Sequence, residues 1–162
     1  MDLWIAARLL LLLVAANGAP IVARKLFGRH GAAPIDGNRR LHDDRPLLGA
    51  SKTWRGLFAA LLTGTILAPL LALPCTLGLT VAAAAMAGDL LSSFIKRRLG
   101  IAPSGMAFGL DQVPESLLPL LVVAPRLGLT FADALQLTAV FLIIELLLSQ
   151  ALYRLNIRRR PY

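Results

Sequence analysis

The polar residues best suited to chemistry lie within residues 88–115, where an otherwise apolar chain gathers carboxylates, hydroxyls and cations. If the apolar run that ends here is helical, five of them share one face, because their spacing is i, i+3, i+4, i+7 and i+8. These five are Asp89, Ser92, Ser93, Lys96 and Arg97. A loop rich in Pro and Gly then brings a second acidic pair, Asp111 and Glu115. Carboxylates on both sides of a basic turn suggest metal-assisted phosphate chemistry.

A second polar stretch, residues 24–55, ends in the sequence GASKTWRG. It matches a phosphate-binding loop only in part, because a Walker A motif has Gly directly before its Lys and this chain has Ser51 before Lys52. Side chains here could still bind an anion together with backbone amides at a helix start. The candidates are Ser51, Lys52, Thr53 and Arg55. Alternatively, Lys52 and Arg55 only anchor the segment at the membrane surface, beside Trp54.

The composition predicts an integral membrane protein. Of the 162 residues, 57% are hydrophobic and the mean hydropathy is +0.69, whereas soluble domains are about 45–50% apolar. The net charge of +8 comes from clustered Lys and Arg beside apolar spans, a pattern typical of membrane topology rather than of nucleic-acid binding. The single cysteine, Cys75, excludes an intrachain disulfide, and with only His30 and His42 a zinc centre is not expected.

Five apolar stretches predict the fold, an all-α polytopic membrane protein with about five transmembrane helices in one domain over residues 1–162. The expected spans are residues 3–22, 56–73, 80–95, 117–129 and 131–155. The fourth has only 13 residues, against the ~20 usually needed to cross, so a re-entrant segment is the alternative to a crossing helix.

Clusters of Lys and Arg set the expected orientation, since positive charges accumulate in cytoplasmic loops. They lie in the loops 24–55 and 96–115 and at residues 154–160, which places the N-terminus outside and the C-terminus in the cytosol. A cleaved signal peptide is the alternative for residues 3–22, but Arg24 and Lys25 follow the apolar core instead of preceding it. We therefore expect a protein of the inner (cell) membrane with its active site on the cytosolic side.

Glu145 lies in the middle of the last predicted span, where a carboxylate is costly and often functional. The simpler interpretation is that Glu145 hydrogen-bonds a neighbouring helix and holds the bundle together. A non-enzymatic transporter or scaffold, with Asp89 and Glu145 as ion sites, is one alternative function. It fits less well, because transporter sites lie near the bilayer midplane whereas most polar groups here lie at the inner edge.

Three motifs carry a resemblance to a known family: PIDGNRRLHDDRPLLGASKTWRG, MAGDLLSSFIKRRLGI and GLDQ, with ANGAP at residues 16–20. Together they resemble the CDP-archaeol synthases, the CTP-dependent cytidylyltransferases of archaeal ether lipids, and more distantly the phosphatidate cytidylyltransferases. The resemblance implies that CTP and a lipid phosphate react with Mg²⁺ to give a CDP-lipid and pyrophosphate. Implied partners are CTP, the lipid phosphate and membrane lipids, without nucleic acid, and a homodimer is left open.

The resemblance also implies roles for individual residues. Asp89 and Asp111 match the carboxylates of the family, which makes them the expected metal ligands. The S-x-x-K-R element corresponds to Ser93, Lys96 and Arg97, and the K-T-W element begins with Lys52 and Thr53. The chain departs from its relatives at Pro114, where an acidic residue is common, so Glu115 is the third candidate ligand.

The expected active site therefore joins two distant segments of the chain. Lys52, Asp89, Lys96, Arg97 and Asp111 are the catalytic candidates, and Ser51, Lys52, Thr53, Arg55 and Ser93 are the candidates for nucleotide binding. If both Lys52 and Asp89 serve the triphosphate, the fold must bring them together. A CTP-dependent lipid kinase is the closest alternative enzyme, and its products, CDP and a phosphorylated lipid, distinguish it.

Overall fold

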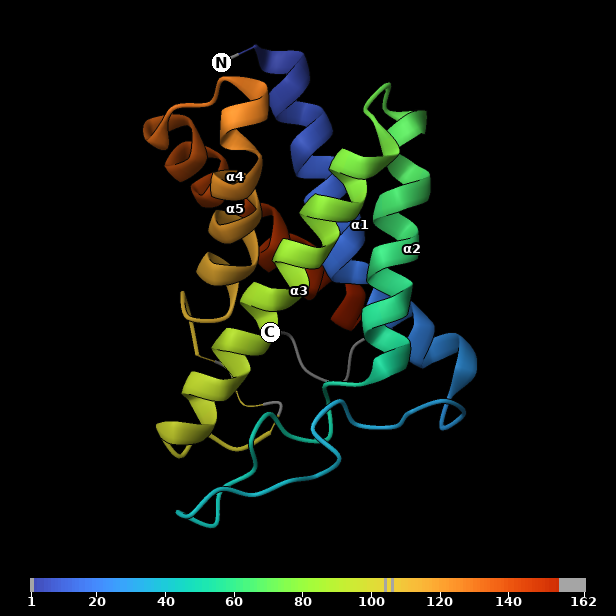
Figure 1. Ribbon diagram of the computed structural model, residues 1–162, viewed down its shortest axis with the longest axis vertical. Helices are drawn as coiled ribbons and strands as arrows, with labels where there is room; N and C mark the ends of the chain where they lie inside the picture. The colour runs from blue at the N-terminus through green and yellow to red at the C-terminus, as the bar shows by residue number, and fades with distance from the viewer. Residues whose placement is uncertain (1, 104, 106, 155–162) are drawn as a thin grey trace.

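The protein is a helical bundle in a computed structural model that describes residues 2–103, 105 and 107–154 (Figure 1). Its helices are α1 (Leu3–Phe27), α2 (Trp54–Leu70), α3 (Cys75–Arg98), α4 (Gln112–Leu127) and α5 (Phe131–Arg154). In the described part of the chain, β structure is limited to two isolated antiparallel bridges, Pro34 with Thr53 and Arg40 with Pro46. The predicted all-α class is confirmed.

The helices begin and end close to the predicted limits, except at three ends that differ by about five residues. One is the start of α4, at Gln112 and not near residue 117; the others are the end of α1 and the start of α3. Helix α1 continues to Phe27 and contains Pro20, so the basic residues Arg24 and Lys25 form its last turn. Cations there complement the negative end of the helix dipole. Helix α3 begins at Cys75, directly after Pro74, and not near residue 80 as predicted. Proline fixes φ but cannot donate a backbone hydrogen bond, so it fits immediately before or at a helix start.

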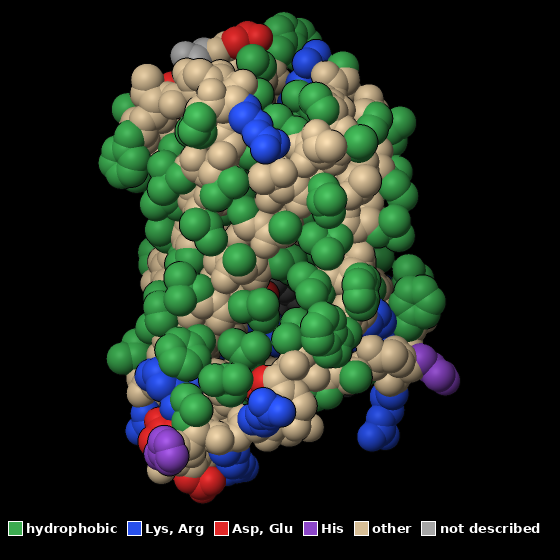
Figure 2. Space-filling view, in the orientation of Figure 1, with side chains coloured by type: hydrophobic (Ala, Val, Ile, Leu, Met, Phe, Trp, Pro, Cys, Tyr) green, Lys and Arg blue, Asp and Glu red, His purple; other side chains and the backbone are tan. Residues whose placement is uncertain are grey.

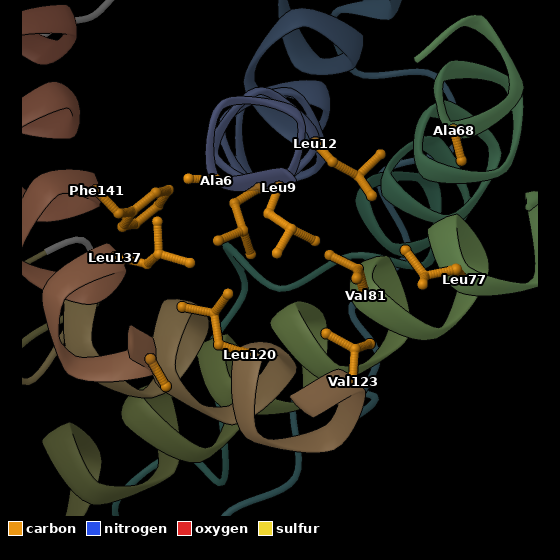
Figure 3. Packing of buried hydrophobic residues seen from close by; sticks show 12 residues of the cluster. Ala6, Leu9, Leu12, Ala68, Leu77, Val81, Leu120, Val123, Leu137 and Phe141 are labelled. Atoms are coloured by element: carbon orange, nitrogen blue, oxygen red, sulfur yellow. The ribbon is translucent and has the colours of Figure 1, made fainter. Parts of the chain in front are cut away.

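Leucines of α1 form the centre of the core (Figure 3). Leu9 and Leu12 are completely buried and face Val81 of α3, while Leu120 of α4 and Phe141 of α5 close the cluster from the other side. A segment packed in this way belongs to the folded domain, which argues against the signal-peptide alternative for residues 3–22. In a bilayer such contacts stabilise mainly through close packing, because lipid chains are as apolar as leucine.

The contact between α2 and α3 depends on small residues. A Cβ added at Gly64 would lie 2.7 Å from the carbonyl oxygen of Gly78, and one added at Gly78 would lie 2.2 Å from that of Gly64. The two backbones therefore touch, as small-residue stripes in membrane helices allow.

Three helices are long and apolar enough to cross a membrane: Leu3–Phe27, Cys75–Arg98 and Phe131–Ala151. Helices α2 and α4, with 17 and 16 residues, are shorter than the ~20 residues of a typical span. The charged side chains on the face shown in Figure 2 gather mainly at one end of the bundle, where the chain segments between α1 and α2 and between α3 and α4 lie in Figure 1. The middle of that face is largely uncharged, as expected for a surface in contact with lipid. The predicted Arg cluster at residues 158–160 lies outside the described residues.

Candidate active site

The loop between α1 and α2, residues 28–53, is folded back on itself. The backbone N–H of Ile35 donates to the carbonyl of Lys52 at 2.9 Å, and the N–H of Trp54 donates to that of Ala33 at 3.1 Å. Thr53 caps α2, its hydroxyl accepting a hydrogen bond from the N–H of Gly56 at 3.2 Å. These bonds fix the backbone of Lys52 one residue before the helix cap.

Arg98, the last residue of α3, holds the middle of this loop in place. Its guanidinium donates to Asp43 Oδ1 at 2.7 Å and to the carbonyl of Pro46 at 2.6 Å, and it lies 5.4 Å from the ring centre of Phe94. The guanidinium of Arg45 in turn donates a hydrogen bond to the carbonyl of Arg98. The loop therefore docks on the end of α3 that carries the other candidate residues.

The fold brings Lys52 to Asp89. The ammonium of Lys52 lies 2.6 Å from Asp89 Oδ1 and 2.5 Å from Oδ2, although the two residues are 37 positions apart. Their side chains are 21% and 25% exposed, so the pair is partly shielded from solvent. The predicted juxtaposition of Lys52 and Asp89 is confirmed.

A hollow with about 340 Å³ of empty space, part of it open solvent, is lined by both residues of this ion pair. Polar groups of the loop and of α3 line one part of it, while apolar side chains of α1, α2 and α3 line the rest. The lining residues are Pro20, Ile35, Ser51, Lys52, Thr53, Gly56, Leu57, Met86, Asp89 and Leu90. The predicted residues Ser51, Lys52, Thr53 and Asp89 therefore share one pocket. The face shown in Figure 2 is hollowed just above the charged end of the molecule.

A second ion pair lies further along α3. Lys96 pairs with Asp111, which stands directly before α4, and the Lys96 ammonium also donates to the carbonyl of Gly105 at 3.1 Å. The other oxygen of Asp111 accepts the N–H of Ala107 at 3.0 Å. The loop between α3 and α4 is thus folded around the Lys96–Asp111 pair.

Arg97 is only 3% exposed, and its Nε and Nη1 atoms have no hydrogen-bond partner among the described residues. It lies beside the first loop, because a Cβ added at Gly49 would be 3.9 Å from Arg97 Nη1. Buried donors of a charged group are costly when they lack acceptors. Arg97 is therefore suited to an anion arriving between the loop and α3.

Two predicted nucleotide-binding residues lie elsewhere. Arg55 is not among the residues lining the pocket; it donates to the carbonyls of Gly28 at 3.1 Å and His30 at 2.6 Å, and so holds the start of the loop. Ser93, one turn beyond Asp89 on α3, is buried and likewise does not line this pocket.

Glu115, in the first turn of α4, is 8% exposed and so largely buried. It interacts electrostatically with Glu145, Asp89, Lys52 and Asp111, most strongly with Glu145. It therefore lies near both the predicted site and Glu145 of α5. Among the described residues, no three His, Cys, Asp or Glu side chains are arranged to hold a metal ion, so Asp89, Asp111 and Glu115 do not form a preformed three-carboxylate centre.

Mg²⁺ does not need such a centre, because proteins usually hold it with one or two carboxylates together with water and substrate phosphates. Asp89 and Asp111 are hard oxygen donors of this kind, and each now neutralises a lysine. The residues present therefore fit Mg²⁺. Its binding would leave the two ammonium groups available to phosphate oxygens.

Sequence inspection missed the role of Asp36, in the turn sequence IDGN. Its carboxylate accepts hydrogen bonds from the N–H groups of Asn38, Leu48 and Gly49 at 2.9–3.0 Å. Burial alone would raise the pKa of Asp36, but these backbone donors outweigh it, and the pKa lies below its ordinary value of 3.8. Asp36 thus stays ionised at neutral pH, and its stabilisation of the loop is lost only as the pH falls below that value. The Asp-Gly dipeptide was the available signal, since it is typical of a tight turn.

Comparison with known proteins agrees with this arrangement. A family model described as "CarS-like: CDP-archaeol synthase" matches residues 3–162. The chain is 39% identical to a CDP-archaeol synthase of Hyperthermus butylicus, over 92% of this chain and 90% of the relative. It is 33% identical to one of Sulfurisphaera tokodaii, over 93% and 90% respectively. A solved structure of an intramembrane enzyme for archaeal membrane lipid biosynthesis superposes with a TM-score of 0.77 at 35% identity, covering 90% of this chain and 92% of that one. The family model matches nearly the whole chain, and the relatives and the solved structure agree with it; the chain therefore belongs to the CDP-archaeol synthase family.

Proposed function

We propose that the protein is a CTP-dependent cytidylyltransferase that activates a lipid phosphate, the activity named by its relatives. The observation that supports this most directly is the Lys52–Asp89 pair, which joins the first loop to α3 beside apolar walls. A site of this composition can hold a phosphate group against the Lys52 ammonium and a lipid chain against its apolar residues. A lipid kinase would also need such a site, but family membership favours the transferase.

The reaction needs charge neutralisation more than it needs a base. A phosphate monoester is mostly dianionic at neutral pH, because its second pKa is about 6. One of its oxygens forms a bond to the α-phosphorus of CTP, and the bond from that phosphorus to the bridging β-phosphate oxygen breaks. The products are the CDP-lipid and pyrophosphate, and no proton has to be removed from the nucleophile.

In this proposal the protein's own residues bring two anions together. Lys52, Lys96 and Arg97 bind the phosphate oxygens and reduce their mutual repulsion. Asp89 and Asp111 would hold Mg²⁺, and Glu115 is the third candidate carboxylate. The metal, when bound, neutralises charge that builds up on the phosphates. Positioning and electrostatics of this kind account for most of the catalysis in phosphoryl-transfer enzymes.

The lipid is expected to approach from the apolar side of the pocket. Leu57 of α2 and Met86 and Leu90 of α3 give the hollow part of its apolar lining. The hydrocarbon chains of the lipid can then stay in contact with these apolar side chains while the phosphate headgroup reaches the Lys52–Asp89 pair.

The decisive experiment uses purified protein in detergent with CTP, Mg²⁺ and lipid phosphates bearing ether, ester or polyprenyl chains. CTP labelled at the α-phosphate should transfer its label to the lipid, with stoichiometric release of pyrophosphate. Transfer of a γ-phosphate label to the lipid, with formation of CDP, would instead identify a kinase.

We also propose that the loop end of the bundle faces the cytosol, because residues 24–55 and 96–98 together carry 11 of the 17 Lys and Arg residues. The native cysteine gives a matched reporter, since Cys75 is exposed at the start of α3, the end of that helix away from Lys96. In intact cells, a membrane-impermeant thiol reagent should label Cys75 but should not label Arg39→Cys in a Cys75→Ser background. The reverse pattern would invert the proposed orientation.

Lys52→Ala is expected to lower kcat/KM for CTP by about 100-fold or more, because a lysine on phosphate acts as a point charge. The KM for the lipid phosphate should change much less. Steady-state kinetics with each substrate varied in turn will test this. Equal losses toward both substrates would contradict a role on the nucleotide.

A further inference from the structure

The carboxylate of Asp36 joins the two limbs of the first loop. Asp36 is 7% exposed, and its oxygens accept the N–H of Asn38 at 3.0 Å, of Leu48 at 2.9 Å and of Gly49 at 3.0 Å. Two of these donors are 12 and 13 residues away along the chain. A carboxylate has enough lone pairs to accept all three, and the charge strengthens each bond.

The bonds made by Asp36 continue directly to Lys52. The residue before Asp36, Ile35, donates its N–H to the carbonyl of Lys52 at 2.9 Å, and the N–H of Lys52 donates to the carbonyl of Gly49 at 3.1 Å. The backbone of Lys52 is therefore held on both sides by groups that Asp36 fixes. Its ammonium then extends to Asp89.

The same corner of the loop borders Arg97. A Cβ added at Gly49 would lie 3.4 Å from Pro103 and 3.9 Å from Arg97 Nη1, and Gly49 has a φ of +100°. Movement of Gly49 would therefore change the space in front of Arg97 as well as the support of Lys52. Asp36 itself does not line the pocket.

We propose that Asp36 is a positioning residue that holds Lys52 and the Gly49 corner in the geometry that binds the triphosphate of CTP. This inference rests on the proposed function for the identity of the ligand. Asp36 touches neither substrate; it acts through the backbone of the loop.

Asp36→Asn tests the proposal with little change in volume. One acceptor becomes an NH₂ donor, so either the N–H of Asn38 or the N–H groups of both Leu48 and Gly49 lose their partner. The bonds that remain also lose the negative charge that strengthens them. Residues that orient a binding group typically change affinity or activity by about 10- to 100-fold when replaced. We expect the KM for CTP to rise by at least about tenfold, with the KM for the lipid phosphate and kcat much less affected.

Asp44→Asn is the matched control. It removes the same charge from the same loop, but the Asp44 side chain is 88% exposed and pairs only at the surface with Arg40. The backbone of Asp44 has a φ of 56°, which asparagine tolerates well. This variant should leave both KM values unchanged.

A second readout does not depend on activity. The chain has only three lysines, and Lys25 is exposed whereas Lys96 is buried. Acylation by an amine-reactive reagent, quantified at each lysine by mass spectrometry, should be faster at Lys52 in Asp36→Asn than in wild type. Lys25 should remain fast and Lys96 slow in both proteins.

The outcomes distinguish a positioning role of Asp36 from a role in general stability, and both from failure of the proposed function. Unchanged Lys52 acylation and an unchanged KM for CTP in Asp36→Asn would overturn the positioning role. Faster acylation at Lys52 and Lys96 alike, with both KM values raised, would also overturn it, because Asp36 would then act on general stability only. If the wild type forms no CDP-lipid, the proposed function fails. Selectively faster acylation of Lys52 in Asp36→Asn would still show that Asp36 holds Lys52 in place.

Discussion

Replacing Asp89 by asparagine is expected to lower kcat for CDP-lipid formation by at least about 100-fold, the largest loss among the charged residues. Two effects combine in this variant. The neutral amide is a poor ligand for Mg²⁺, and it no longer holds the Lys52 ammonium, which lies 2.5 Å from Asp89 Oδ2. Replacing even an outer-shell partner of a metal commonly costs 10–100-fold, about the lower bound for a direct ligand.

Kinetics as a function of Mg²⁺ concentration distinguish the two roles of Asp89. If Asp89 binds the metal, Asp89→Asn should need much more Mg²⁺, and Lys52→Ala should not. If Asp89 only orients Lys52, the double variant should be no worse than Lys52→Ala alone, since the two residues then act as one unit. Asp44→Asn serves again as the charge control. Near-normal turnover of a folded Asp89→Asn protein would remove Asp89 from the site.

Gly88→Ala is expected to abolish most activity through a single added methyl group. A Cβ at Gly88 would lie 2.1 Å from the carbonyl oxygen of Pro114 and 2.8 Å from the backbone nitrogen of Glu115. Both are backbone atoms, so no side-chain rotation relieves the overlap and α4 must move away from α3. Overpacking of this kind typically destabilises by about 1–3 kcal/mol. Here the displaced helix, α4, carries Glu115 in its first turn and begins directly after Asp111. Gly88 itself is adjacent to Asp89, so the displacement changes the geometry of the candidate site.

Gly78→Ala provides a matched comparison for Gly88→Ala. Its added Cβ would lie 2.2 Å from the carbonyl oxygen of Gly64, an overlap of similar severity with the backbone of α2. Gly78 lies near the start of α3, about three helical turns from Asp89. We expect both variants to lose thermal stability, measured in detergent by unfolding of the purified proteins. The folded fraction of Gly88→Ala should be far less active than the folded fraction of Gly78→Ala. Equal specific activities of the two variants would contradict the role of the α3–α4 contact in positioning the site.

Much of this protein follows from local sequence. The apolar stretches define five helices, three of them long and apolar enough to cross a membrane, where a segment must satisfy its backbone hydrogen bonds internally. Their limits could be predicted to within about five residues; the largest differences are the end of α1, which continues to Phe27, and the starts of α3 and α4, at Cys75 and Gln112. The motifs also identify the family and mark Lys52, Asp89, Lys96 and Asp111 as the charged residues of interest.

The pairing of these charges was decided by tertiary structure alone. Asp89 and Lys96 share a helix face, yet they lie seven residues apart, about 10 Å along the axis, which is too far for an ion pair. Each therefore takes its partner from another segment: Asp89 pairs with Lys52 and Lys96 with Asp111. The importance of Asp36 is hidden in sequence for the same reason, because Leu48 and Gly49 reach it only when the loop closes. Periodicity along a chain determines which residues share a face, whereas contacts between segments depend on how loops and helices fold against one another.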